Sequence, residues 1–99
     1  MFDFEIVKQT FLPDLHVRFI DEFQPGILIA FVENAGYATI IDMRSKQISD
    51  FAINKYDKMV MFGIIKLQKC PHHYLVKHKG GIKIVNPVLK RWYDLCFDN

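Results

Sequence analysis

The chain has 99 residues, 51% of them hydrophobic, and a formal net charge of +2. This length suits one domain, and the apolar content excludes a disordered chain because it is enough for a packed core. The longest uninterrupted apolar run, residues 59–65, is far shorter than the roughly 20 residues of a membrane span. Charged side chains interrupt the first twenty positions, so we expect no signal peptide there. We therefore expect one soluble, cytoplasmic domain over residues 1–99.

The first quarter of the chain contains one expected strand and one ambiguous segment. Residues 2–8 alternate between large apolar and other side chains, which predicts a strand with one buried face. Residues 13–23 begin with proline and place apolar side chains at helical spacing, which predicts a helix. The same segment also alternates at Leu15, Val17 and Phe19, so a strand stays open there.

The middle of the chain predicts an antiparallel meander over about residues 27–53, with a slip or bulge near Asp50. Its three expected strands are residues 27–33, 37–43 and 47–53. Residues 58–69 are apolar on most sides, which predicts a buried helix lying on the sheet. A strand stays open for this segment too, because it is rich in β-branched side chains.

The last third predicts a hairpin followed by a helix. Residues 74–78 and 82–86 flank a Gly-Gly turn, so we expect a β-hairpin over 74–86. Asn86 suits an N-cap and Pro87 suits the first helical position, which together predict a C-terminal helix over residues 87–96. No internal repeat is visible. The expected fold class is α+β, with two to three helices packed on the sheet.

Charge is distributed unevenly along the chain. Residues 1–57 contain nine acidic and five basic side chains, whereas residues 58–93 contain eight basic side chains and no acidic one. A long acid-free stretch concentrates positive potential wherever its side chains meet, and lysines on a hairpin also protect a solvated sheet edge. We expect the hairpin and the last helix to bind an anionic partner through Lys77, His78, Lys79, Gly80, Gly81, Lys83, Lys90 and Arg91.

The first functional hypothesis is therefore a non-enzymatic binding or regulatory protein. Nucleic acid is its first expected partner, because lysines that contact phosphates displace condensed counterions, and an acidic protein surface is the second. A different hypothesis is a small phage- or plasmid-type interaction factor that inhibits a host protein. Small size, oppositely charged halves and surplus aromatic side chains favour it, and an exposed apolar patch would also allow a homodimer.

The histidines and cysteines suggest two further kinds of site. Zinc accepts the residue types Cys70, His72, His73, His78 and Cys96, but no Cys-x-x-Cys pair is present, so we expect no metal and no cofactor. The stretch HHYLVKHKGG, residues 72–81, resembles the strand-borne histidine segment of small toxins with a double-stranded-RNA-binding-like fold. That resemblance implies a third hypothesis, a small ribonuclease in which histidine and lysine act as acid and base.

Overall fold

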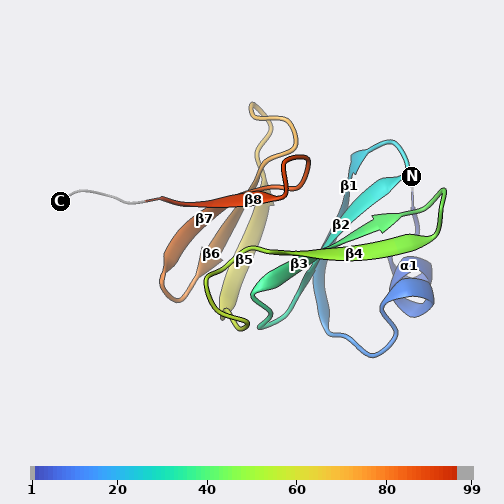
Figure 1. Cartoon of the computed structure of the whole chain (residues 1–99), viewed down its shortest axis with the longest axis horizontal. Coiled ribbons are helices and arrows are strands. Elements are labelled where there is room, and N and C mark those ends of the chain that lie inside the picture. The colour runs from blue at the N-terminus through green and yellow to red at the C-terminus, as the bar shows by residue number, and fades with distance from the viewer. Residues whose placement is uncertain (1, 96–99) are drawn as a thin grey trace.

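The computed structural model describes residues 2–95, which form a mostly β fold of two four-stranded antiparallel sheets and a short helix (Figure 1). The predicted α+β class, with two to three helices on a sheet, is wrong. Sheet 1 has the order β1-β2-β3-β4 and sheet 2 the order β5-β6-β7-β8, so each sheet is a meander. The elements are α1 (Phe4–Phe11), β1 (Val17–Gln24), β2 (Ile27–Val32), β3 (Tyr37–Asp42), β4 (Gln47–Ala52), β5 (Met61–Lys66), β6 (Tyr74–His78), β7 (Gly81–Asn86) and β8 (Arg91–Leu95).

The elements stack in three layers, in the order α1, sheet 1, sheet 2 (Figure 1). The inner face of sheet 1 packs on the inner face of sheet 2, with Phe31 and Tyr74 at the centre of that core. The outer face of sheet 1 packs against α1 through Leu28, Ile41 and the helix residue Val7. Sheet 1 is therefore buried on both faces, which explains the nearly continuous apolar run of β2.

A polar contact fixes the two sheets against each other at the β1–β5 side. The Tyr74 hydroxyl donates to Asp21 Oδ2 at 2.5 Å, and Lys66 Nζ lies 3.0 Å from the same oxygen. Burial, and then the hydrogen bond to Asp21, raise the pKa of Tyr74 well above its usual range. Lys66 therefore has a carboxylate partner from the N-terminal half of the chain.

The two sheets are repeats of one structural unit. Adding 44 to the residue numbers of β1, β3 and β4, and 46 to those of β2, converts the pairing of sheet 1 into the pairing of sheet 2. Both first strands carry an irregularity at their second residue, Arg18 in β1 and Phe62 in β5. The expectation of no internal repeat is wrong. The repeat is not visible in the sequence because the two units share strand register but few identical residues.

The turns β3–β4 and β7–β8 show the same repeat. In the first, Asp42 Oδ1 accepts from two backbone N–H groups that follow it, and in the second Asn86 Oδ1 does the same. Each turn ends at a lysine with positive φ, Lys46 at 58° and Lys90 at 54°. The left-handed residue sends the chain back as a strand instead of letting the capped turn continue as a helix.

This turn explains why the predicted helix over residues 87–96 is wrong. Asn86 does accept from the N–H groups of Val88 and Leu89 as an N-cap would, but the chain reverses at Lys90 and continues as β8. The end of the predicted helix, from residue 96, lies outside the described residues. The pairing of β6 with β7 is present as the sequence predicts for residues 74–86.

The other differences concern segments whose apolar pattern suits two structures. Residues 4–11 form α1 instead of a strand because Asp3 Oδ1 accepts from the N–H groups of Glu5 and Ile6, which caps a helix. The helices predicted at 13–23 and 58–69 are wrong, because those segments contain β1 and β5. The meander strands predicted within 27–53 are present, but β3 and β4 pair in regular register, without the slip predicted near Asp50.

The crossover from sheet 1 to sheet 2, residues 53–60, is held on the β2–β3 turn. Gly36 N–H donates to the Asp57 carbonyl at 2.7 Å, and the Ile53 N–H donates to the Gly36 carbonyl at 2.9 Å. The Met59 N–H donates to the Asn34 carbonyl at 3.2 Å. These bonds hold the crossover against the β2–β3 turn. No helix within residues 2–95 has the length and hydropathy needed to cross a bilayer.

Candidate anion-binding cleft

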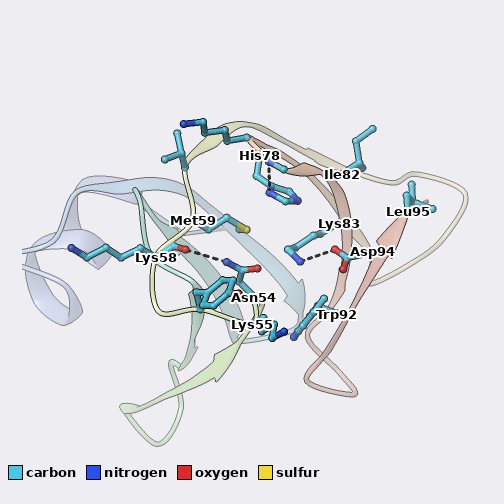
Figure 2. Close-up of a pocket in the computed structure, with 14 residues that line it drawn as sticks. Asn54, Lys55, Lys58, Met59, His78, Ile82, Lys83, Trp92, Asp94 and Leu95 are labelled. Atoms are coloured by element: carbon cyan, nitrogen blue, oxygen red, sulfur yellow. Dashed lines mark hydrogen bonds and ion pairs between the residues drawn. The ribbon is translucent and has the colours of Figure 1, made fainter. Parts of the chain in front are cut away.

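A cleft of about 680 Å³ opens between the crossover and the β6–β7 turn, and we call it the hairpin cleft (Figure 2). Its lining comes from the crossover, from the β6–β7 turn with the start of β7, and from β8. This volume lies in the range typical of pockets for small ligands. The lining contains the side chains of four lysines and one carboxylate, Asp94.

Lys83 forms the floor of the hairpin cleft. Strand alternation turns its side chain to the inner face of sheet 2, where the residue is only 2% exposed. Its Nζ lies 2.7 Å from Asp94 Oδ1, on the facing residue of β8, and 3.8 Å from the centroid of the Trp92 ring (Figure 2). The buried ammonium is thus balanced by one carboxylate, whose side chain is itself 53% exposed, and by the face of an indole ring.

Three exposed lysines surround this floor. Lys55 and Lys58 come from the crossover and Lys79 from the β6–β7 turn. Lys55 Nζ lies 5.8 Å from the ring centroid of the exposed Tyr56, whereas the side chain of Lys58 points away from Lys83 (Figure 2). Lys55 and Lys79 are therefore the exposed cations that we assign to the rim of the cleft.

His78 contributes a hydrogen-bond donor and not a charge at neutral pH. The Gly80 N–H donates to His78 Nδ1 at 3.1 Å, so in the neutral ring the proton lies on Nε2. Burial, and then the nearby ammonium of Lys83, lower the pKa of His78, while Asp94 opposes the shift. Protonation of Nδ1 would also remove the acceptor of the Gly80 bond.

We expect this histidine to make the fold less stable in mild acid. The folded pKa of His78 lies below its unfolded value near 6.5, so the unfolded chain binds more protons as the pH falls. The contribution is complete above about pH 6.5 and is lost as the pH falls through the folded pKa. Urea unfolding at pH 7.5 and 5 should show a smaller pH dependence in His78→Gln than in the wild type. An equal pH dependence in both proteins would contradict this assignment.

The residues predicted to form one anion-binding face lie in three places. His78, Lys79, Gly80 and Lys83 line the hairpin cleft. Lys77 lies on the outer face of sheet 2, because it pairs with Ile82 in register and alternates with His78. Gly81 begins β7 with φ 137°, a backbone conformation that favours glycine.

Lys90 and Arg91 lie at the end of sheet 2 opposite the β6–β7 turn, just before the cleft residue Trp92. They follow the β7–β8 turn, whereas the cleft adjoins the β6–β7 turn at the other end of β7. Both are exposed. The structure therefore does not bring these two cations to the lysines of the cleft.

Sequence reasoning missed the aromatic and acidic part of the cleft. The sequence predicts that Trp92 and Asp94 lie on a helix. They lie on strand β8, where they pair with Val85 and Lys83. The signal that would have found Asp94 is its place directly opposite Lys83 once β8 is aligned with β7. Lys55 and Tyr56 carry no such signal, because only the hydrogen bonds between the crossover and the β2–β3 turn bring them here.

The histidines do not form a catalytic pair in the described chain. His73 donates from Nδ1 to the Pro71 carbonyl at 2.9 Å and accepts at Nε2 from the Asn86 amide at 3.3 Å. His78 lies at the other end of β6, roughly 17 Å along the strand from His73. His72 packs edge-on against Phe23, with ring centroids 6.4 Å apart. Among residues 2–95 no three histidine, cysteine or acidic side chains gather as metal ligands do.

Comparison with known protein families, curated proteins and solved structures finds no match for this chain.

Proposed function

We propose that this protein is a non-enzymatic binding protein whose hairpin cleft docks an anionic partner, with single-stranded nucleic acid as the first candidate. The observation that carries the proposal is the surplus positive charge of the cleft, which has the rim lysines Lys55 and Lys79 and the floor lysine Lys83 against a single carboxylate from the described residues. That carboxylate, Asp94, already lies 2.7 Å from the buried ammonium of Lys83. Within residues 2–95 the lining of the cleft therefore offers no second carboxylate to balance the rim lysines, and their positive potential can attract an anionic ligand.

The aromatic side chains of the cleft support a nucleic-acid ligand over a simple inorganic anion. Tyr56 is 68% exposed at the rim, and Trp92 is partly exposed on the wall. Single-stranded nucleic acids are bound by grooves that combine basic side chains with aromatic rings on which bases stack. A cleft of about 680 Å³ has room for a few nucleotide groups and is too small to enclose a duplex.

The proposal places binding in the cytoplasm. The exposed free thiol of Cys70 suits a reducing compartment, because exposed free thiols form disulfides in oxidising compartments.

Reversal of charge at the rim should remove most of this binding. We expect the double variant Lys55→Glu/Lys79→Glu to lose affinity for a single-stranded oligonucleotide on the order of tenfold at 50 mM salt, because two phosphate contacts are lost. The slope of log affinity against log salt should also become shallower by about 1.4, at about 0.7 per contact. Fluorescence anisotropy with a labelled 12-nucleotide strand, between 50 and 200 mM salt, measures both quantities.

The double variant Lys90→Glu/Arg91→Glu is the matched control. It makes the same change in net charge at two exposed residues at the far end of sheet 2. We expect its affinity to stay within about threefold of the wild type at about 0.1 M salt and above, since only long-range potential changes, and that is screened beyond about 10 Å there. Equal losses in the two variants, or no binding by the wild type at low salt, would reject the cleft as the nucleic-acid site. A duplex that binds as tightly as the single strand would reject the preference for single strands.

A further inference from the structure

The outer face of sheet 2 is apolar and uncovered in the described part of the chain. Ile65, Leu75, Ile84 and Tyr93 are register partners on four successive strands, so their side chains form one row across this face. Ile65 is 56% exposed and Tyr93 47% exposed, and neither core cluster of residues 2–95 includes any of the four. The next row contains Lys77, Ile82 and Leu95.

The internal repeat shows what such a face does in this fold. The four residues of the row correspond to Asp21, Ile29, Ile40 and Ser49, which lie on the inner face of sheet 1. That inner face is covered by the inner face of sheet 2. The inner face of sheet 2 corresponds in turn to the outer face of sheet 1, which α1 covers.

From this correspondence we infer that the outer face of sheet 2 is a docking surface for the outer face of sheet 1 of a second copy, and that α1 is the cap that blocks the docking. Two sheets already stack in this way inside one molecule. A second copy continues the same stack once its helix leaves sheet 1, and the contact is head-to-tail, so it extends into a linear assembly.

Charge complementarity supports this occupant. Inside the molecule Phe31 packs on Tyr74, with ring centroids 5.9 Å apart, and Lys66 lies directly opposite Tyr74. In the equivalent contact between two copies, Lys77 of one copy takes the place of Phe31. It packs on Leu28 of the other copy, which takes the place of Tyr74. Glu22 lies directly opposite Leu28 in sheet 1. The stack therefore places Lys77 on the residue that Glu22 faces across the sheet, so that the two opposite charges lie in the same part of the interface.

The same charges disfavour pairing of two outer faces of sheet 2 with each other. Lys77 carries the charge within the two rows described above, so such a dimer brings like charges together without a carboxylate between them. On the outer face of sheet 1 the charged strand residues Glu22 and Asp50 are both acidic. The outer face of sheet 1, which α1 covers, is thus complementary in charge to the outer face of sheet 2.

The helix is a suitable removable cap. It has eight residues, and an isolated helix of this length is marginal in water, so its position depends on side chains such as Val7, 2% exposed against sheet 1. We expect the wild type to sediment as a monomer, and Val7→Asp, which drives α1 off the sheet, to form species whose average mass rises with protein concentration. Ile6→Asp changes an isoleucine of the same helix that is 62% exposed, and it should remain monomeric.

Further substitutions separate the proposed stack from unspecific aggregation. Ile84→Glu, added to Val7→Asp, should restore the monomer, as should Lys77→Glu, and adding Glu22→Lys to the latter should restore assembly. Wild-type protein should act as a chain terminator, because its sheet 2 docks while its own sheet 1 stays capped. An equimolar addition should therefore lower the average mass of the assemblies.

Four assembly results would overturn the inference. They are a folded Val7→Asp that stays monomeric, assembly that ignores Ile84→Glu, assembly that ignores added wild type, and a wild type that dimerises through Ile84. Circular dichroism establishes whether each variant is folded. If Val7→Asp is unfolded, Gln9→Pro breaks the helix at an exposed residue without placing a charge on the sheet. Loss of the fold in both variants also overturns the inference, because the cap must leave an intact sheet.

Discussion

Replacement of Gly36 by alanine is expected to abolish folding, or to lower the melting temperature by about 10 °C or more. A Cβ at this residue would overlap the carbonyl oxygen of Tyr56 and lie 2.9 Å from the carbonyl carbon of Asp57. Both are backbone atoms, so no side chain can rotate away. The crossover would have to leave the β2–β3 turn, with loss of the Gly36–Asp57 and Ile53–Gly36 hydrogen bonds.

Gly63→Ala is the matched control for this substitution. Gly63 lies within β5 on the outer face of sheet 2, and a Cβ there meets no atom within 4 Å. We expect its unfolding free energy to change by less than about 1 kcal/mol, because a strand tolerates alanine at least as well as glycine. Thermal and urea unfolding followed by circular dichroism compare the two. A Gly36→Ala protein as stable as Gly63→Ala would show that the crossover is not seated on the turn.

The two partners of the buried ion pair should respond very differently to substitution. Asp94→Asn leaves the ammonium of Lys83 buried without a carboxylate, and we expect it to cost about 3 kcal/mol of unfolding free energy. The ring of Trp92, 3.8 Å away, retains part of the stabilisation. Lys83→Met removes the buried charge and keeps an apolar stem, while Asp94 stays half exposed to water. That variant should change stability by less than about 1 kcal/mol.

The same pair of variants also tests the cleft. Lys83→Met should weaken oligonucleotide binding in the folded protein because the ammonium at the floor is gone, whereas its stability stays close to that of the wild type. Urea unfolding and anisotropy on the same samples separate the two effects. If Lys83→Met lowered the unfolding free energy as much as Asp94→Asn or more, the buried ammonium would itself stabilise the fold, contrary to this expectation.

Local sequence patterns identified the strands but not the fold class. Strict alternation and tight turns predicted the strands at 27–53 and 74–86, because hairpin pairing depends on residues close in sequence. The segments at 13–23, 58–69 and 87–96 suit either helix or strand locally. Pairing with neighbouring strands made them β, and the cap at Asn86 was misleading because the positive φ of Lys90 is a single backbone feature that no periodicity reveals.

The candidate site shows the same limit. His78 and Lys79 were predicted from an acid-free stretch of sequence, and they do line the cleft. Alternation along β6 turns Lys77 to the other face of the sheet, a consequence that the hairpin prediction already contained. The burial of Lys83 under Trp92 depends on β8, a strand where the local sequence predicts a helix.

The order of the layers follows the order of the chain, and this bears on how the polypeptide is completed during synthesis. Residues 4–52 contain α1 and the whole of sheet 1, whose pairings join only consecutive strands, so this part closes short loops before β5 exists. Its inner face, with Phe31 and Ile29, is fully buried only after β6 and β7 have emerged from the ribosome. We expect the nascent half-chain to be the form most in need of chaperone protection.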